Sequence, residues 1–227
     1  MSKEIRLDIS TGQYREDRIW SLETHRKIWD GLPSVGNCVS GELICTVDVP
    51  SANIPRNAKV IPYLRSAGAS TWKKKSEFFV FSRSEDQSTG LVTLVCYDAI
   101  FKAEDSFTQP GNQGTWPKTD KQVMQIIAQR TGASINADTL TMMNKGYQIP
   151  YPGIVMEDST LKPDGKNALT MREVAGRIAA MYAGNWIINN DGEWQLVVLG
   201  DIPVDQNLLI TEDGYNIVIG GVRILVR

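Results

Sequence analysis

The residues that could perform chemistry are few and scattered in this chain. His25 is the only histidine, so nucleophilic catalysis that relies on histidine would have to use it. It lies in the charged run Glu23-Thr-His-Arg-Lys, which is typical of a solvated surface. The cysteines, Cys38, Cys45 and Cys96, show none of the spacings of a zinc site, and one histidine does not complete such a set. The sequence therefore predicts no catalytic site, no metal site and no bound cofactor.

The cysteines are better explained as core residues. Cys45 falls on the apolar side of an alternating segment, and Cys96 lies within a second one. A free cysteine behaves as a small hydrophobic residue when it is buried. We predict buried free thiols, and the odd number leaves an intermolecular disulfide or a reactive thiol as the alternative.

Paired carboxylates are the other chemical signal. A glycosidase needs two carboxyl groups facing each other across a cleft, one of them with a raised pKa. Adjacent acids in loops are more often solvated turn residues, and we interpret these pairs in that way. Gly165-Lys166 does not form a phosphate loop, because Thr160 and Asn167 replace the required glycine and hydroxyl residue. The acidic pairs are Glu85-Asp86, Glu104-Asp105, Glu157-Asp158 and Glu212-Asp213.

Six tryptophans could support binding to sugars or to other proteins. Trp186 and Trp194 belong to an expected hairpin and should pack under the helix that starts at Thr170. Trp72 and Trp116 lie in segments that resemble loops, so we expect them to be exposed. Aromatic residues are enriched in the buried cores of interfaces, which makes these two the candidate interface aromatics.

Composition excludes several classes of protein. The 227 residues carry a formal net charge of −2, with 22% charged and 42% hydrophobic residues, as is ordinary for a globular protein. The sequence contains no basic stripe of the kind that would predict sequence-specific nucleic-acid binding. No segment approaches the ~20 apolar residues of a membrane span, and the charged N-terminus is unlike a signal peptide. We expect a protein without a membrane anchor, synthesised in the cytoplasm.

Alternating residues predict a β-rich first part of the chain. In the segment around 39–49, Leu43, Cys45 and Val47 fall on one side and Ser40, Glu42, Thr46 and Asp48 on the other, with Ile44 as the one apolar exception. Short strands at regular intervals predict a closed or nearly closed antiparallel β-barrel, which we assign to residues 1–103. The expected strands are 4–9, 18–24, 39–49, 59–65, 78–83 and 91–97.

Residues 104–204 have a mixed α/β character. A helix should start at Thr119, which forms a capping-box pair with Gln122, and stop at Gly132. A short helix around 138–144, ended by Gly146, and an exposed loop over 150–167 follow. A second main helix should run over 170–182, capped by Thr170 and Glu173 and ended by Gly184. Ala175 and Ala179 would let another element approach it closely. A hairpin should then join 186–189 to 193–198 across Asn190-Asp-Gly.

Residues 205–227 read as the beginning of a second β-barrel. The chain stops inside an alternating run, and a strand without a successor leaves an open edge. We therefore expect either that the natural polypeptide continues past Arg227 or that a neighbouring molecule completes this edge. The fold class is thus α+β: a mainly antiparallel barrel, a small domain of two helices and a hairpin, and the start of another β unit.

The order of these segments resembles that of the hub proteins of bacteriophage and prophage tails, which are components of the tail tip or baseplate. The resemblance covers most of 34–199. It lies in the segment at 33–65 and in three further stretches, and no single short motif carries it. Those stretches are Glu77-Phe-Phe-Val-Phe-Ser-Arg, Leu91-Val-Thr-Leu-Val-Cys-Tyr-Asp-Ala and Thr170-Met-Arg-Glu-Val-Ala-Gly.

The resemblance implies a structural protein rather than an enzyme. In the hub family, three copies form a ring whose barrels are related to the tail-tube fold. The ring joins the tail tube or a distal tail protein to the spike or fibre, and its channel passes DNA. This chain would then be made in the bacterial cytoplasm and assembled into the virion tail tip or baseplate. The alternative is a module at the tail tip that binds carbohydrate or the cell surface. A tail-borne wall hydrolase, the third class, lacks a catalytic constellation here.

Overall fold

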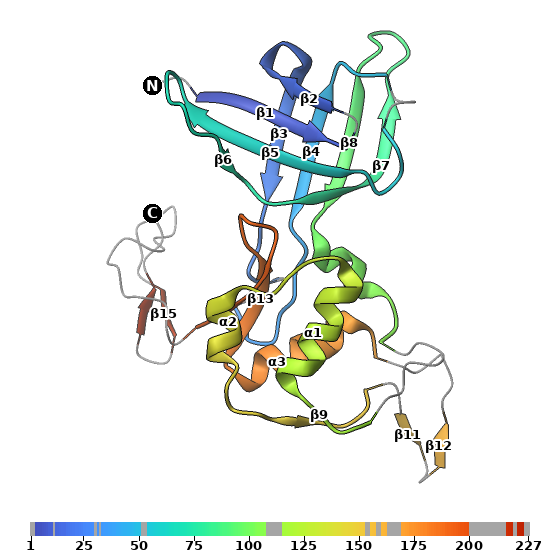
Figure 1. Cartoon of the computed structure of the whole chain (residues 1–227), viewed down its shortest axis with the longest axis vertical. Coiled ribbons are helices and arrows are strands. Elements are labelled where there is room, and N and C mark those ends of the chain that lie inside the picture. The colour runs from blue at the N-terminus through green and yellow to red at the C-terminus, as the bar shows by residue number, and fades with distance from the viewer. Residues whose placement is uncertain are drawn as a thin grey trace.

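The computed structural model has an α+β fold with a nearly closed antiparallel β-barrel above a smaller helical part (Figure 1). Side chains and backbone are described for 3–10, 12–29, 31, 33–50, 54–107, 115–152 and 169–199. For 155–157, 160–162, 217–219 and 222–224 the structure describes the backbone strands.

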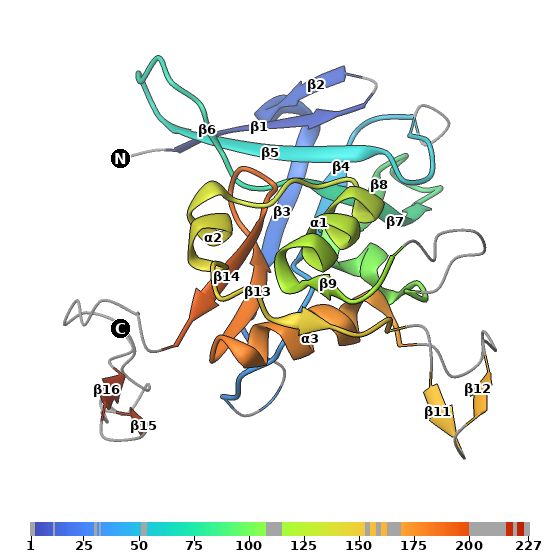
Figure 2. The same ribbon diagram turned by 60° about the horizontal axis from the view of Figure 1, so that its bottom comes forward.

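The barrel is one eight-stranded sheet in the order β2-β1-β5-β7-β8-β4-β3, with β6 paired to β5. All of its pairings are antiparallel. Figure 2 shows β1 and β5 crossing over β3 and β4, so the sheet folds back on itself around its core. The strands are β1 (Lys3–Ile9), β2 (Gly12–Arg15), β3 (Ile19–His25), β4 (Glu42–Val47), β5 (Lys59–Ser66), β6 (Lys73–Lys74), β7 (Phe78–Glu85) and β8 (Val92–Tyr97); the short helix η1 (Glu16–Arg18) joins β2 to β3.

The predicted alternation fills the barrel core. In β4 the side chains of Leu43, Cys45 and Val47 are fully buried, and those of β8 alternate in the same way. Leu7 and Ile9 of β1 complete the core from the opposite layer. Full burial of such side chains is worth about 1.5–3 kcal/mol each, which makes alternation a strong determinant of register. The strands predicted from the sequence are confirmed, with ends that differ by a few residues.

The smaller part packs three helices against a hairpin. These elements are η3 (Ala99–Glu104), β9 (Lys118–Thr119), α1 (Asp120–Thr131), α2 (Ala137–Met142), β10 (Gln148–Ile149), α3 (Met171–Met181), β13 (Gly184–Ile188) and β14 (Trp194–Val198). Both predicted capping boxes are present, Thr119 with Gln122 and Thr170 with Glu173. Gly132 ends α1 in the left-handed conformation at a φ of 75°. The predicted hairpin is confirmed, with Gly192 in its turn at a φ of 81°.

Trp186 and Trp194 lie at the centre of this second core. Both side chains are fully buried, and their rings pack edge to face at 5.9 Å between centroids. The Trp186 indole nitrogen donates to the Ala175 carbonyl of α3 at 2.9 Å, and that of Trp194 donates to Thr131 Oγ1 at 3.0 Å. The prediction that they pack under the helix starting at Thr170 is therefore confirmed for Trp186, whereas Trp194 bonds to α1 and packs on Trp186.

Three predicted details differ from the structure. Gly184 does not end α3: the helix ends at Met181, Ala183 takes the left-handed conformation at a φ of 52°, and Gly184 begins β13. The reason is space, since a Cβ at Gly184 would lie 2.7 Å from the Val197 carbonyl oxygen. The short helix α2 ends at Met142 rather than running to Gly146. The expected loop over 150–167 contains a paired hairpin, β11 (Val155–Glu157) and β12 (Thr160–Lys162).

In the tail, β15 (Ile217–Ile219) pairs with β16 (Val222–Ile224). The rest of the tail, 200–216, 220–221 and 225–227, lies outside the described residues. The division into 1–103, 104–204 and 205–227 stays a prediction.

The turn between β13 and β14 docks onto the barrel. Ser76 donates from its backbone N–H to the Asn190 carbonyl at 2.9 Å and from its hydroxyl to the Asn189 carbonyl at 2.9 Å. Arg26 donates to Asn190 Oδ1 at 3.0 Å, and Lys74 Nζ donates to the Asp191 carbonyl at 2.8 Å. These bonds join segments far apart in sequence and fix the hairpin against the barrel.

Asp98 holds a second junction, where β8 leads into η3. Its buried carboxylate accepts bonds from the Gly41 N–H at 2.7 Å, the Ser40 hydroxyl at 2.9 Å and the Ile100 N–H at 3.0 Å. Burial raises the pKa of this carboxyl to about 6, and the three hydrogen bonds oppose the shift. Desolvation therefore disfavours the charged carboxylate by more than its hydrogen bonds favour it.

We expect Asp98 to give the stability of the protein a pH dependence below neutrality. Because its folded-state pKa lies above the unfolded value of about 4, the native state binds more protons in between, so the free energy of unfolding falls as pH rises from about 4 to 6. Asp98→Asn removes this titration. The free energy of unfolding of Asp98→Asn minus that of wild type should therefore rise by about 2 kcal/mol as the pH increases from about 4 to 6. Urea denaturation at a series of pH values measures this difference, and parallel curves for the two proteins would contradict it.

Candidate interaction surfaces

The candidate chemical groups do not assemble into a reactive site in the described part of the chain. No group of three or more metal-ligating side chains occurs there. His25 is exposed at the end of β3, with its Nε2 3.7 Å from a Glu23 carboxylate oxygen. All three cysteines are buried and free, as predicted. Burial raises the pKa of the Cys38 thiol, and a hydrogen bond with Cys45 followed by burial raises that of Cys96, so neither is activated as a nucleophile.

The acidic pairs that the structure describes have local partners. Asp86 accepts hydrogen bonds from the backbone and hydroxyl of Ser88 in the turn between β7 and β8, and these bonds lower its pKa. Glu104 forms an ion pair with Arg172 of α3. Both arrangements fit the interpretation as turn and surface residues. The side chains of the pairs at 157–158 and 212–213 lie outside the described residues.

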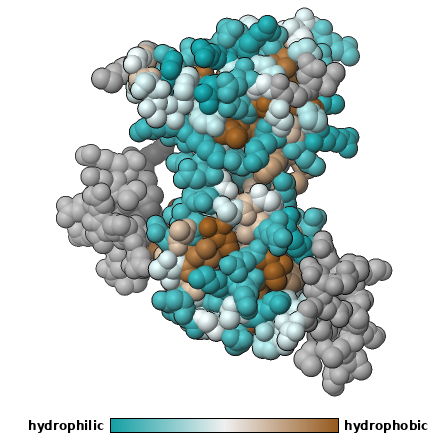
Figure 3. Space-filling view, viewed as in Figure 1, coloured by the Kyte–Doolittle hydropathy of each residue, from teal (hydrophilic) through white to brown (hydrophobic). Residues whose placement is uncertain are grey.

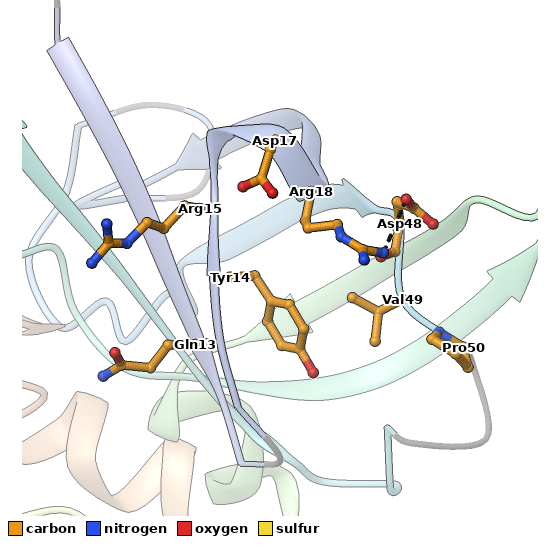
Figure 4. Close-up of a pocket in the computed structure, with 8 residues that line it drawn as sticks. All are labelled: Gln13, Tyr14, Arg15, Asp17, Arg18, Asp48, Val49 and Pro50. Atoms are coloured by element: carbon orange, nitrogen blue, oxygen red, sulfur yellow. Dashed lines mark hydrogen bonds and ion pairs between the residues drawn. The ribbon is translucent and has the colours of Figure 1, made fainter.

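Two grooves are lined by polar side chains. One, of about 640 Å³, lies between β2, η1 and the end of β4 (Figure 4). Arg18 reaches across it to Asp48 with a nitrogen–oxygen distance of 3.2 Å, while Tyr14 lies between them and Gln13. The second, of about 730 Å³, lies between the segment 35–39 and α3. In the second groove the Thr170 hydroxyl lies 3.2 Å from a Glu173 carboxylate oxygen, but these two side chains form the capping box of α3.

Trp72 lies on the outer side of the β1–β5 layer and is half-buried. The guanidinium of Arg65 lies 4.4 Å from its ring centroid and that of Arg6 lies 5.2 Å away. Arg6 also stacks on Tyr63 at 4.1 Å. Cations over aromatic rings attract each other and hold the planar groups in register. The expected exposure of Trp72 is thus only partial, and its role in an interface stays a prediction.

We call the outward side of β2, β1 and β5, with Trp72, the cationic face. Arg15 pairs in register with Arg6, which pairs with Tyr63, so the two cations and the ring form one row across three strands. Its acids Asp8 and Glu4 are each engaged, by Arg6 at 2.9 Å and by Arg65 at 2.5 Å. Arg15 is exposed and forms no ion pair with a residue that the structure describes. In Figure 3 the β1–β5 side of the barrel, which faces the viewer, is largely hydrophilic.

Trp116 does not belong to the barrel. It is half-buried at the edge of the helical core, where its ring packs edge to face on Phe107 at 6.0 Å and on Tyr151 at 5.2 Å. Its indole nitrogen is buried without a hydrogen-bond partner among the described residues. The structure therefore does not bring Trp72 and Trp116 together, and each contacts a different hydrophobic or cationic cluster.

The most exposed large hydrophobic side chains of the described chain are Trp20 and Phe81, at 70% and 56% exposure. Each stands at a break in strand register: between Ile19 and Ser21 in β3, and between Val80 and Ser82 in β7. A β-bulge inserts an extra residue into one strand and re-aims its side chain. Sequence reasoning singled out neither residue. The alternation of β7, with Phe78 and Val80 buried, already turns Phe81 outward, whereas the register break depends on the partner strand.

Phe81 joins a cluster of exposed and half-exposed apolar residues, which we call the aromatic face. Its ring contacts Tyr97 of β8 at 5.5 Å and Phe101 of η3 at 5.0 Å, and the last two stack at 5.1 Å. Ile44 and Val95 are paired across β4 and β8 and continue this face. The outward position of Ile44, the one apolar exception in the predicted pattern of its strand, is a signal of this face in the sequence.

Known proteins resemble the chain in structure but not in sequence. Neither a protein-family model nor a curated protein matches it. The 43 kDa tail protein of prophage MuSo2 from Shewanella oneidensis is similar with a TM-score of 0.51 and 13% identity, over 86% of this chain and 54% of that protein. The tail protein from Neisseria meningitidis MC58 is similar with a TM-score of 0.51 and 11% identity, over 93% of this chain and 57% of that protein.

These similarities show that the chain shares a fold with these two tail proteins, and that it spans about half the length of each. No helix in the described part of the chain has the length and hydropathy needed to span a membrane.

Proposed function

We propose that the chain is a structural component of a phage or prophage tail, and that three copies of it form a hub at the tail tip or baseplate. The observation that supports this most directly is the fold it shares with the tail proteins from Shewanella oneidensis and Neisseria meningitidis. The function is assembly rather than turnover. In keeping with that, the barrel exposes Trp20 and Phe81 instead of burying them, and exposed apolar patches of this kind mark interaction sites.

In this proposal the barrel of 1–103 forms the ring, and 104–204 is an intervening domain beside it. Residues 205–227 begin a second barrel. One end of the ring meets the tail tube or a distal tail protein, and the other meets the spike or fibre. The protein would be made in the bacterial cytoplasm and incorporated into the virion tail.

The mass of the protein in solution tests self-assembly. Light scattering after size exclusion, over a wide concentration range, should give three times the monomer mass or a rise toward it. A ring contact of this kind should bury roughly 1,000 Å² or more. A strict monomer at every concentration would contradict the proposal.

A further inference from the structure

The barrel carries two chemically different outer faces on opposite sides of its core. The aromatic face lies on β7, β8 and β4, and the cationic face on β2, β1 and β5; Leu7 and Leu43, from the two layers, meet in the core between them. Figures 1 and 2 show the β1–β5 layer on one side and the β4–β8 layer on the other. The two faces of one molecule therefore cannot contact each other.

The faces are complementary in chemistry. On the aromatic side, the outward charged residues of the central strand β4 and its neighbour β3 include two acids, Glu42 and Glu23, with His25 beside them. The cationic face offers guanidinium groups, among them that of Arg15, which forms no ion pair within the described part of the chain. Arginine is favoured at interfaces because its planar group both stacks on aromatic rings and pairs with carboxylates. A cation, Lys102 of η3, lies 3.2 Å from the Phe79 ring centroid, so the acidic residues border the aromatic surface on its β3–β4 side. That side suits an arginine-rich surface.

Phe81 is the central residue of the aromatic face. An antiparallel sheet with one side in a core usually presents polar side chains on the other. Here Phe81, Ile44, Val95 and Tyr97 are turned outward, and Phe81 stands at the register break between Val80 and Ser82. Large aromatic residues surrounded by half-exposed contacts are the usual centre of an interface.

We infer that the aromatic face of one copy of this chain docks on the cationic face of the next, with Phe81 and Phe101 against the arginines around Trp72. This inference rests on the proposed self-assembly and names its contact. Because the two surfaces differ, the contact is heterologous, and a heterologous contact forms a ring when the rotation between copies closes and an open filament when it does not. Trp72 then acts by holding Arg6 and Arg65 in position.

Two variants test the two faces separately. Phe81→Lys places a cation on the aromatic face, and Arg15→Glu places an acid on the cationic face; both residues are exposed, so neither change should unfold the barrel. Each should raise the dissociation constant for self-association at least about tenfold. Val35→Lys is the matched control, since Val35 is 46% exposed but lies beside α3. Circular dichroism should report the same fold for all four proteins.

Mixing the two variants distinguishes this contact from others. Each variant keeps one intact face, so the mixture of Phe81→Lys and Arg15→Glu should regain an assembly larger than a monomer in sedimentation. If Phe81→Lys dissociates the protein while Arg15→Glu does not, the contact is aromatic to aromatic, and the inference is wrong. If wild type associates and both variants associate equally, self-assembly stands and these faces do not mediate it. A wild-type monomer at every concentration would overturn both proposals.

Discussion

Replacing Trp186 with alanine should destabilise the protein by about 3–5 kcal/mol, the range for removing a large aromatic side chain from a core. The side chain is fully buried between α3 and Trp194, and its loss leaves the Ala175 carbonyl without the indole donor. Because typical domains are stable by only about 5–15 kcal/mol, a loss of this size should lower the denaturation midpoint strongly. Urea unfolding followed by circular dichroism measures it.

The matched control is Trp20→Ala, the same substitution at a tryptophan that is 70% exposed. Its free energy of unfolding should change by no more than about 0.5 kcal/mol. Equal losses for the two variants would mean that Trp186 is not the centre of the second core.

Gly176→Ala should destabilise the protein by about 2 kcal/mol, although alanine is the better helix former by about 1 kcal/mol. A Cβ at this position of α3 would lie 2.5 Å from the Gly36 carbonyl oxygen, so the segment around Gly36 would have to move. That segment is held by the Gly36 N–H, which donates to the Gly184 carbonyl at 2.8 Å, and by the Asn37 N–H, which donates to Asn185 Oδ1 at 2.7 Å. Thermal and urea denaturation measure the change.

Arg177→Ala is the control for this prediction, since Arg177 is the next residue of α3 and is exposed. It should leave the free energy of unfolding within about 0.5 kcal/mol of wild type. A Gly176→Ala variant more stable than wild type would show that helix propensity outweighs the close contact. The segment 33–37 would then not be packed tightly on α3.

Local patterns predicted most of the secondary structure. The capping boxes at Thr119 and Thr170 involve residues three positions apart, so their sequence determines their geometry. The alternation of Leu43, Cys45 and Val47 determines which side of β4 is buried. The end of α3 was predicted at about Tyr182, within a residue of where it lies, but Gly184, the residue expected to stop it, begins β13 and Ala183 takes the left-handed conformation. Gly184 lies against the Val197 carbonyl across the hairpin, where a Cβ would be only 2.7 Å from the oxygen. The glycine is therefore required by that close approach and not by the end of the helix.

The candidate surfaces were predicted much less completely. Trp72 was recognised as a candidate, but its stacking partners Arg6 and Arg65 come from two other strands. Trp20 and Phe81 were not singled out, and the register breaks at which they stand are properties of two paired strands. Composition with a net charge of −2 indicated no basic surface, yet folding gathers Arg6, Arg15 and Arg65 on one side of the barrel. Summed charge carries no information about where charges meet.

The sequence by itself determined the α+β class, the barrel strands, the two capped helices and the tryptophan hairpin, because these follow from periodicity and from contacts between near neighbours. Only the tertiary structure decided the two faces of the barrel, the docking of the hairpin turn on Ser76 and the approach of Gly36 to Gly176. Those features join residues that are distant in the chain. They depend on strand order and on register, and sequences with the same local pattern can adopt different strand orders and registers.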